Sequence, residues 1–138
     1  MYPPQIVAPM KAELTNNGFT DLTTPAEVDA VLQQEGTTLL VINSVCGCSA
    51  GSARPGVLMA VKNATKLPDR LTTAFAGFDM DAVAKARTYL LPYPPSSPAI
   101  ALIKNGQVVH IIERHSIEGR AAQMIAANLM QAFEAHCN

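Results

Sequence analysis

The sequence predicts an α/β domain with three layers, in which helices flank a central mixed β-sheet. Leu39 to Ile42 is a continuous apolar run, typical of a strand buried on both faces. Strand-like and helix-like segments alternate after it, which indicates crossover connections between parallel strands. Asn105-Gly106 separates two further apolar runs and predicts a hairpin with an antiparallel edge strand. The 138 residues fit a single domain over 1–138 with one core.

Two helices are predicted before the buried strand. Pro9 to Leu14 is a short helix candidate. A second helix begins at Thr24, which we expect to cap it, and Glu27 completes a capping box. Apolar residues then recur at helical spacing until Gly36 ends the helix, and a strand over 37–45 follows.

Helix and strand patterns continue to the C-terminus. A helix is expected from Cys48 to about Lys66, with a kink at Pro55, because proline lacks the N–H and clashes with the preceding turn. A strand over Leu71 to Phe78 then follows, and after it a helix that Asp79 or Asp81 caps and that continues to Leu90. Two strands, Ala99 to Lys104 and Gln107 to Glu113, and a closing helix, Arg120 to His136, complete the chain.

Cys46 and Cys48 lie where the buried strand ends and a helix begins. A helix N-terminus presents free N–H groups and a partial positive charge, both of which favour thiolate over thiol. In open α/β sheets, functional sites lie beyond the carboxyl ends of the strands. The position of the two cysteines therefore indicates thiol chemistry.

Composition excludes several function classes. The net charge is −1 and no basic stripe is present, which argues against a nucleic-acid partner. The N-terminal residues do not resemble a signal peptide, and no apolar run approaches the roughly 20 residues of a membrane span. We therefore expect a cytoplasmic protein with no membrane partner. Three cysteines in that compartment indicate catalysis, metal binding or chance rather than a structural disulfide framework, since thiols stay reduced there.

The order of elements, with cysteines after a buried strand, resembles the thioredoxin-like fold. More closely, NSVCGCSAGSARPG and YPPSSPAIALIKNGQVVHIIERHSIEGR resemble the bacilliredoxins, small cytosolic proteins with a Cys-Gly-Cys motif. The resemblance extends from about Met10 to Ala135. It implies reduction of mixed disulfides between proteins and bacillithiol, a low-molecular-weight thiol, and also weak disulfide-isomerase activity.

The resemblance also implies roles for individual residues. Cys46 matches the attacking cysteine, Cys48 the second cysteine and Pro98 a cis-proline, with the Ser97 backbone presented to an extended substrate. Bacillithiol is implied as a co-substrate, with no bound cofactor. The implied partners are bacillithiolated client proteins and the free small thiol.

Residues around the motif have weaker predicted roles. Gly47 tolerates the backbone angles of a strained Cys46–Cys48 ring, and Ser49 caps the helix or donates a hydrogen bond to a thiolate. Bacillithiol carries a malate with two carboxylates, which an arginine can bind; solvated surface charge is the alternative for each candidate. The candidates are Arg54, Arg114 and Arg120.

Three histidines and a third cysteine are further candidates for redox or tuning roles. His110, His115 and His136 are expected to be surface or structural residues, although His115 lies where it could tune a thiolate. Cys137 is expected to be an exposed thiol near the C-terminus, with a third redox role left open.

Two other functions remain open. The two cysteines could hold a soft metal, although no second Cys/His pair with ligand spacing is present and a closed zinc site needs four ligands. The protein could instead serve only as a binding partner, which the intact cysteine pair argues against.

Overall fold

The computed structural model describes all residues, 1–138. In chain order the elements are α1 (Pro4–Thr15), β1 (Thr20–Asp21), α2 (Pro25–Leu32), β2 (Thr37–Asn43), the π-helical segment η1 (Ser49–Ala53), α3 (Arg54–Asn63), β3 (Arg70–Phe75), α4 (Met80–Tyr89), β4 (Ala99–Lys104), β5 (Gln107–Ile112), the short 3-10 helix η2 (Arg114–Ser116) and α5 (Ala122–His136). No helix is long and apolar enough to cross a membrane.

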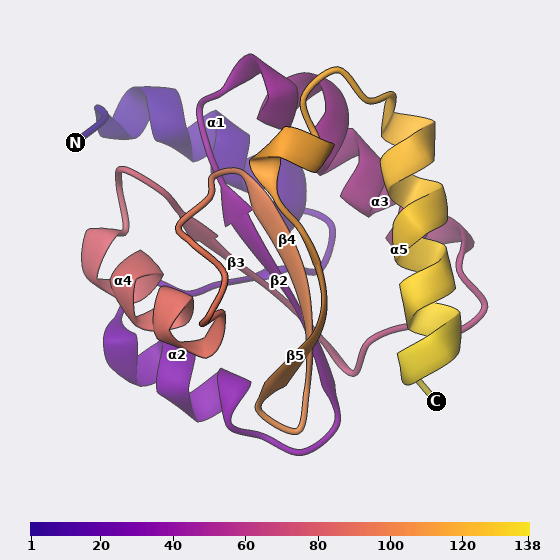
Figure 1. Cartoon of the computed structure of the whole chain (residues 1–138). Helices are drawn as coiled ribbons and strands as arrows, with labels where there is room; N and C mark the ends of the chain where they lie inside the picture. The colour runs from indigo at the N-terminus through magenta and orange to yellow at the C-terminus, as the bar shows by residue number, and fades with distance from the viewer.

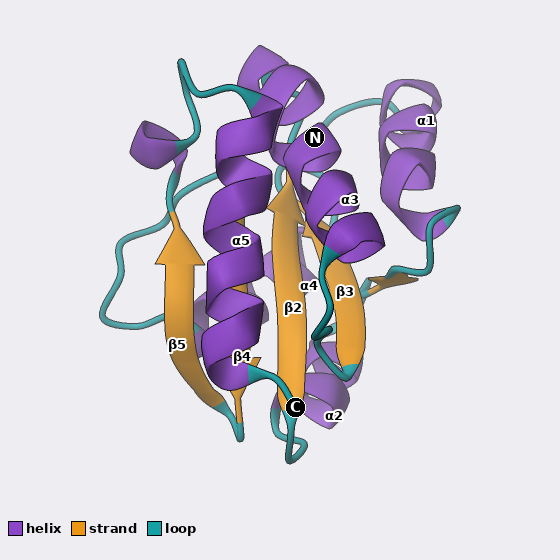
Figure 2. Ribbon diagram, turned by 90° about the vertical axis from the view of Figure 1, so that its right-hand side faces the viewer, coloured by secondary structure: helices purple, strands orange, loops and turns teal.

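One five-stranded sheet, in the order β1-β3-β2-β4-β5, forms the middle layer. β1, β3 and β2 are parallel, whereas β4 and β5 are antiparallel to their neighbours. Helices α2 and α4 cover one face, and α3 and α5 cover the other (Figures 1 and 2). The predicted three-layer α/β fold with a mixed sheet is confirmed. The two-residue strand β1 was not predicted.

The central strand β2 contributes to two hydrophobic cores. Leu39 and Val41 belong to the cluster that α1, α3 and α5 complete, whereas Leu40 and Ile42 belong to the cluster beneath α2 and α4. All seven residues of β2 are buried. Burial on both faces explains why Leu39 to Ile42 are continuously apolar and do not alternate with polar residues.

The second crossover differs from the prediction of parallel strands. β2 and β3 are parallel, but β4 is antiparallel to β2, with Ala99 opposite Ile42. After α4, the loop of residues 90–98 carries the chain back along the sheet before β4 begins (Figure 1). The loop therefore ends beyond the carboxyl end of β2, where the cysteine motif also lies.

Two local predictions are confirmed. The hydroxyl of Thr24 accepts a hydrogen bond from the Glu27 N–H, and the Glu27 carboxylate accepts one from the Thr24 N–H, which completes the capping box of α2. Asn105 and Gly106 have φ of 52° and 79°, as expected of a tight hairpin turn.

The helices differ in detail from the sequence-based prediction. α1 begins at Pro4 and contains Pro9, whereas the prediction began at Pro9. The helix after Cys48 begins as the π-helical η1, in which the Arg54 N–H donates to the Ser49 carbonyl, and becomes α-helical at Arg54. Pro55 is thus the second residue of α3, and its missing N–H falls where the π-helical pattern of η1 changes to the α-helical pattern of α3.

Candidate active site

The cysteine motif begins three residues after β2. The Cys46 N–H donates to the Ser44 hydroxyl at 2.9 Å, and the Cys46 carbonyl accepts from the Ser49 N–H at 2.9 Å. The thiols of Cys46 and Cys48 are both free and partly exposed. The turn that starts the helix therefore holds Cys46 by hydrogen bonds on both sides of its backbone.

The surroundings shift the two thiol pKa values in opposite directions. The pKa of Cys46 is lowered, first by a hydrogen bond from the Cys48 thiol, then by the Cys48 and Ser49 backbone N–H groups and the charge of Arg114. Burial and the Cys46 sulfur raise the pKa of Cys48 to about 11. Cys46 therefore loses its proton more readily than Cys48, and the Cys48 thiol stabilises the Cys46 thiolate when it forms.

Cys46 lines a cavity of about 440 Å³ beyond the carboxyl ends of β2 and β3. Ser97 and Arg114 lie in the wall of the same cavity, and Tyr2 and Gly77 contribute to it as well. Cys48 does not line this cavity and packs against the core cluster of α3 and α5. Access from solvent therefore favours Cys46 over Cys48.

The loop before β4 contributes the facing side of this cavity. The Ser97-Pro98 peptide bond is cis, as predicted. Since Ala99 pairs with Ile42, the preceding residues Ser97 and Pro98 lie beside the end of β2 from which the cysteine turn departs. The structure thus brings together the two segments that the sequence separates by about fifty residues.

Arg114 is the predicted arginine that lies at the site. It is exposed; its guanidinium contacts the Glu118 carboxylate and the Ser97 carbonyl, the latter at 3.5 Å. Its backbone N–H donates to the Ser96 hydroxyl at 2.7 Å. Arg114 lies in η2, which follows β5, and these contacts hold its positive charge beside Cys46.

Arg54 does not lie on the surface, which corrects the prediction of a substrate-binding role. Its side chain is only 1% exposed. The guanidinium donates to the Glu13 carboxylate, the Asn43 amide oxygen, the Ser44 carbonyl and the Ser49 hydroxyl, at 2.9 to 3.1 Å. Through its bonds to Ser44 and Ser49, the buried guanidinium supports the cysteine turn from the protein interior. Because it is buried, it cannot contact a carboxylate from solution.

The predicted supporting residues have different roles. The Ser49 hydroxyl donates to the Asn43 side chain at 3.0 Å and does not point to a thiolate; the group that faces the Cys46 sulfur is the Ser49 backbone N–H. Gly47 is exposed, and an added Cβ would meet no atom within 4 Å. The expected need for glycine there concerns the oxidised ring and stays a prediction.

Arg120 and the histidines are distributed around the molecule. Arg120 is exposed and lines neither of the cavities near the cysteines, so the structure does not support its predicted substrate contact. His110 hydrogen-bonds Asn128 at 2.6 Å, and the His136 carbonyl accepts from Lys104. His115 is exposed and lines the second cavity described below.

Cys137 lies at the opposite end of the sheet from the cysteine motif. It is 4% exposed, belongs to the core cluster of α3 and α5, and has the Thr37 side chain as a neighbour, while burial raises its pKa. Thr37 is the first residue of β2, and Cys46 follows the last. The seven residues of β2 span about 20 Å, so roughly this distance separates Cys137 from Cys46. Burial contradicts the expected exposed thiol, and the separation contradicts a direct redox role with Cys46.

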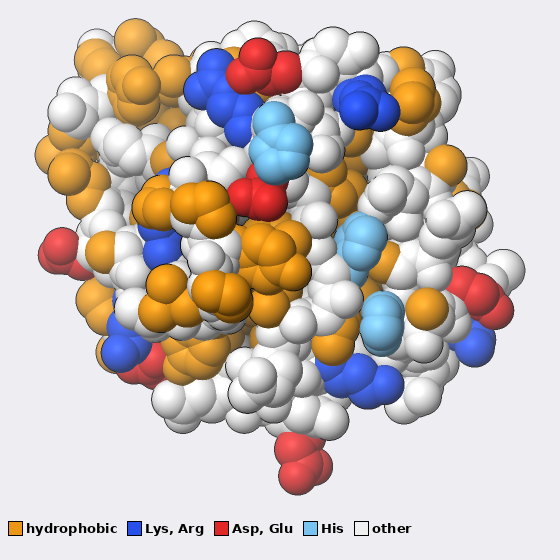
Figure 3. Space-filling model, viewed as in Figure 1, with side chains coloured by type: hydrophobic (Ala, Val, Ile, Leu, Met, Phe, Trp, Pro, Cys, Tyr) orange, Lys and Arg blue, Asp and Glu red, His pale blue; other side chains and the backbone are white.

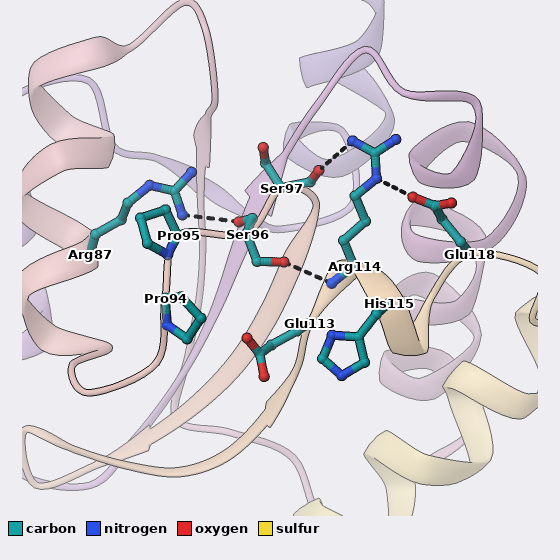
Figure 4. A pocket seen from close by; sticks show the side chains of 9 residues that line it. All are labelled: Arg87, Pro94, Pro95, Ser96, Ser97, Glu113, Arg114, His115 and Glu118. Atoms are coloured by element: carbon teal, nitrogen blue, oxygen red, sulfur yellow. Dashed lines mark hydrogen bonds and ion pairs between the residues drawn. The ribbon is translucent and has the colours of Figure 1, made fainter.

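A second, larger cavity of about 690 Å³ adjoins the first and shares Ser97 and Arg114 with it. Its other walls come from α4, the Pro-rich loop and the η2 segment, with Arg87, Glu113 and Glu118 among the lining residues (Figure 4). In Figure 3, charged and histidine side chains gather over η2 beside hydrophobic side chains. Sequence reasoning missed Arg87, because its helical spacing suggested a structural position on α4.

The residues offer little to a metal ion. The structure contains no group of three or more His, Cys, Asp or Glu side chains that could hold one. Two thiols alone leave a soft metal under-coordinated by the standard of closed protein sites.

Comparisons with known proteins agree with this geometry. A family model described as disulphide isomerase matches residues 2–137. The bacilliredoxin of Cytophaga hutchinsonii is 60% identical over 134 residues, which cover 97% of this chain and 98% of that protein. The bacilliredoxin of Bacillus cereus is 53% identical and covers 99% of this chain and 95% of its own length.

Solved structures show the same fold at low identity. Mitochondrial thioredoxin 3 of Saccharomyces cerevisiae has a TM-score of 0.59 at 15% identity, covering 89% of this chain and 98% of its own. Thioredoxin of Fasciola hepatica has a TM-score of 0.60 at 16% identity, covering 86% and 99%. The match along nearly the whole chain places it in a family: it belongs to the bacilliredoxins and is a thiol–disulfide oxidoreductase with a thioredoxin-like fold.

Proposed function

We propose that this protein reduces mixed disulfides between bacillithiol and cytoplasmic proteins, with Cys46 as the nucleophile and Cys48 as the resolving thiol. The observation that carries the proposal is the asymmetry of the pair. Cys46 has a lowered pKa and lines an open cavity, whereas Cys48 has a pKa of about 11 and packs against the core. Membership in the bacilliredoxin family supports bacillithiol as the small thiol.

The first step is a thiol–disulfide exchange. The Cys46 thiolate attacks the bacillithiol sulfur of the mixed disulfide; the bond between Cys46 and bacillithiol forms, and the client leaves as a thiolate. Arg114 stabilises the attacking thiolate before this step, since its charge contributes to the lowered pKa. No bound cofactor is required.

The second step resets the enzyme. Either Cys48 attacks Cys46 and expels bacillithiol as its thiolate, which leaves a Cys46–Cys48 disulfide that two further molecules of bacillithiol reduce to the dithiol, or a second bacillithiol attacks the sulfur of the bound bacillithiol, so that the symmetric bacillithiol disulfide forms and Cys46 leaves as a thiolate. The high pKa of Cys48 makes it a slow nucleophile until Cys46 is no longer a thiolate, because the Cys46 sulfur is among the causes of that high pKa. A reducing cytoplasm would supply the free thiol.

The substrate is tested by side-by-side turnover of one client protein carrying either bacillithiol or glutathione. We expect faster release of bacillithiol, because the family resemblance implies that thiol. Equal rates, or faster release of glutathione, would contradict the substrate but leave the oxidoreductase chemistry intact.

The division of labour is tested by intact-mass spectrometry of two variants after incubation with a bacillithiolated client. Cys46→Ser should abolish client release, because Cys48 packs against the core cluster and lies away from the cavity. Cys48→Ser should release the client once and accumulate protein carrying bacillithiol on Cys46. Capture of the small thiol by the Cys46→Ser protein would show that the roles are reversed.

Disulfide isomerisation is a second candidate, favoured by the description of the matching family model. The same thiolate can attack a non-native protein disulfide, and a strained Cys46–Cys48 ring reopens easily. Reactivation of a scrambled disulfide protein, compared between wild type and Cys48→Ser, measures this activity.

A further inference from the structure

The second cavity is placed where a molecule bonded to Cys46 can extend. It shares Ser97 and Arg114 with the cavity that Cys46 lines, and with about 690 Å³ it is the larger of the two. Its lining is rich in charged and polar groups. It therefore suits a small polar molecule better than an apolar side chain of a client protein.

The charges in this cavity are not all paired. The Arg114 guanidinium is already in contact with Glu118 (Figure 4). The Arg87 guanidinium has one hydrogen-bond partner, the Ser96 carbonyl at 3.0 Å, and no carboxylate lies within ion-pair distance of it. Arg87 is thus a cation that faces the cavity without a counter-ion.

Burial makes this unpaired charge significant. Arg87 is partly buried, and desolvation lowers its pKa with no acidic neighbour to offset the effect. A partly desolvated guanidinium that retains free N–H donors gains most from a carboxylate, which it can bind through two parallel hydrogen bonds. The Glu113 carboxylate, which also lines the cavity, makes no side-chain hydrogen bond or ion pair in the structure.

From this geometry we infer that the second cavity holds the small-thiol half of the mixed disulfide, and that Arg87 binds a carboxylate of that thiol. The inference rests on the proposed function, since it assumes that Cys46 exchanges with a mixed disulfide. It adds a specificity-determining residue on α4, separate from Arg114. The ligand class is a low-molecular-weight thiol that carries at least one carboxylate.

The test compares three caps on one client protein: bacillithiol and glutathione, which carry carboxylates, and 2-mercaptoethanol, which carries none. The variants are Arg87→Gln, Arg87→Lys and Lys85→Gln. Lys85 is the matched control, because it lies on the same helix but pairs with Asp29 and lines no cavity near the cysteines. The readout is kcat/KM for client release.

Arg87→Gln should lower kcat/KM for the bacillithiol cap by about 10- to 100-fold, as expected for a lost hydrogen-bonded charge pair. The 2-mercaptoethanol cap should change by less than about twofold, which also shows that the fold and Cys46 are intact. Arg87→Lys should recover part of the rate, because it restores the charge without the two-pronged geometry. Lys85→Gln should match wild type for every cap.

Two results would overturn the inference: an equal loss with all three caps, which indicates an effect on the fold or on Cys46, or an unchanged preference for the carboxylated caps in Arg87→Gln. The proposed function fails separately, when wild type does not release bacillithiol preferentially over glutathione. In that case the glutathione cap still tests Arg87, since it carries carboxylates too.

Discussion

At the Cys46 sulfur, a thiol donor, backbone N–H groups and the charge of Arg114 together lower the pKa against the desolvation that raises it. The first of these comes from Cys48, whose own pKa rises in return. When this pair loses a proton, the charge is held at the more accessible sulfur. This arrangement differs from a single activated cysteine, because the Cys48 thiol donates a hydrogen bond to the Cys46 thiolate before Cys48 itself acts as a nucleophile.

Arg114→Gln should raise the pKa of Cys46, because it removes a positive charge that favours the thiolate. Alkylation of Cys46 by iodoacetamide rises with pH as the thiolate forms and levels off above the pKa. In the variant the midpoint moves to higher pH, and the rate at neutral pH falls by about two- to fivefold, the range for an exposed charge pair. Mass mapping of the alkylated peptide gives the rate for Cys46 alone.

Arg120→Gln is the control for this measurement, since Arg120 is exposed but lines neither cavity. High salt should narrow the difference between wild type and Arg114→Gln, because exposed charges are screened. A profile for Arg114→Gln that superimposes on wild type at low salt would contradict the role of this charge.

The junction of β2 with α3 is the element that positions the nucleophile. The Asn43 side-chain oxygen accepts hydrogen bonds from the Ser44 N–H, the Ser49 hydroxyl and Arg54, so strand end, turn and helix share one acceptor. Glu13 of α1 provides the carboxylate for the buried Arg54. Hydrogen bonds with the buried side chains of Asn43 and Arg54 thus hold the turn, while packing on α5 holds α3.

Gly56 permits the close approach of α3 to α5. A Cβ there would lie 2.6 Å from Ile125 Cβ and 2.7 Å from its Cγ2. Gly56→Ala should therefore lower the free energy of unfolding, since overpacking costs about 1–3 kcal/mol and the gain in helix propensity offsets at most about 1 kcal/mol. Urea denaturation measures the change.

Gly51→Ala is the matched control, because its Cβ would meet no atom within 4 Å. The double variant Gly56→Ala/Ile125→Gly should be less destabilised than the sum of the two single changes, since Ile125→Gly removes both the Cβ and the Cγ2 with which the new methyl group collides. Strict additivity would show that Gly56 does not act through Ile125.

At the scale of the whole molecule, the sheet separates two kinds of cysteine. Cys46 and Cys48 lie beyond the carboxyl end of β2, and Cys137 lies buried beside its first residue. The intervening strand has no residue exposed to solvent. Thiol exchange needs direct contact between sulfurs, so the third cysteine stands apart from the reaction.

Cys137→Ala should leave client release and recycling unchanged, apart from a modest loss of stability at a buried position. The measurements are steady-state turnover and peptide mapping of wild type after oxidation. Mapping should find no disulfide between Cys137 and either motif cysteine within one molecule. A Cys46–Cys137 bridge in folded monomer would contradict the separation described here.

Local patterns in the sequence were sufficient for much of the architecture. The continuous apolar run at Leu39 to Ile42, the Thr24 capping box and the Asn105-Gly106 turn each depend on neighbours within a few residues. The position of Cys46 at the end of a buried strand follows from the same short-range information. These features were predictable because backbone geometry and capping are local interactions.

Burial and proximity between distant segments were decided only by the tertiary structure. The sequence predicts Arg54 as a surface cation. In the structure its guanidinium is buried and donates hydrogen bonds to the side chains of Glu13 and Asn43, which come from other elements. Likewise, the return of the loop before β4 brings Arg87 and Ser97 into one cavity wall, and the end of α5 buries Cys137. Whether a polar group is buried depends on partners far away in the chain, and no local pattern encodes them.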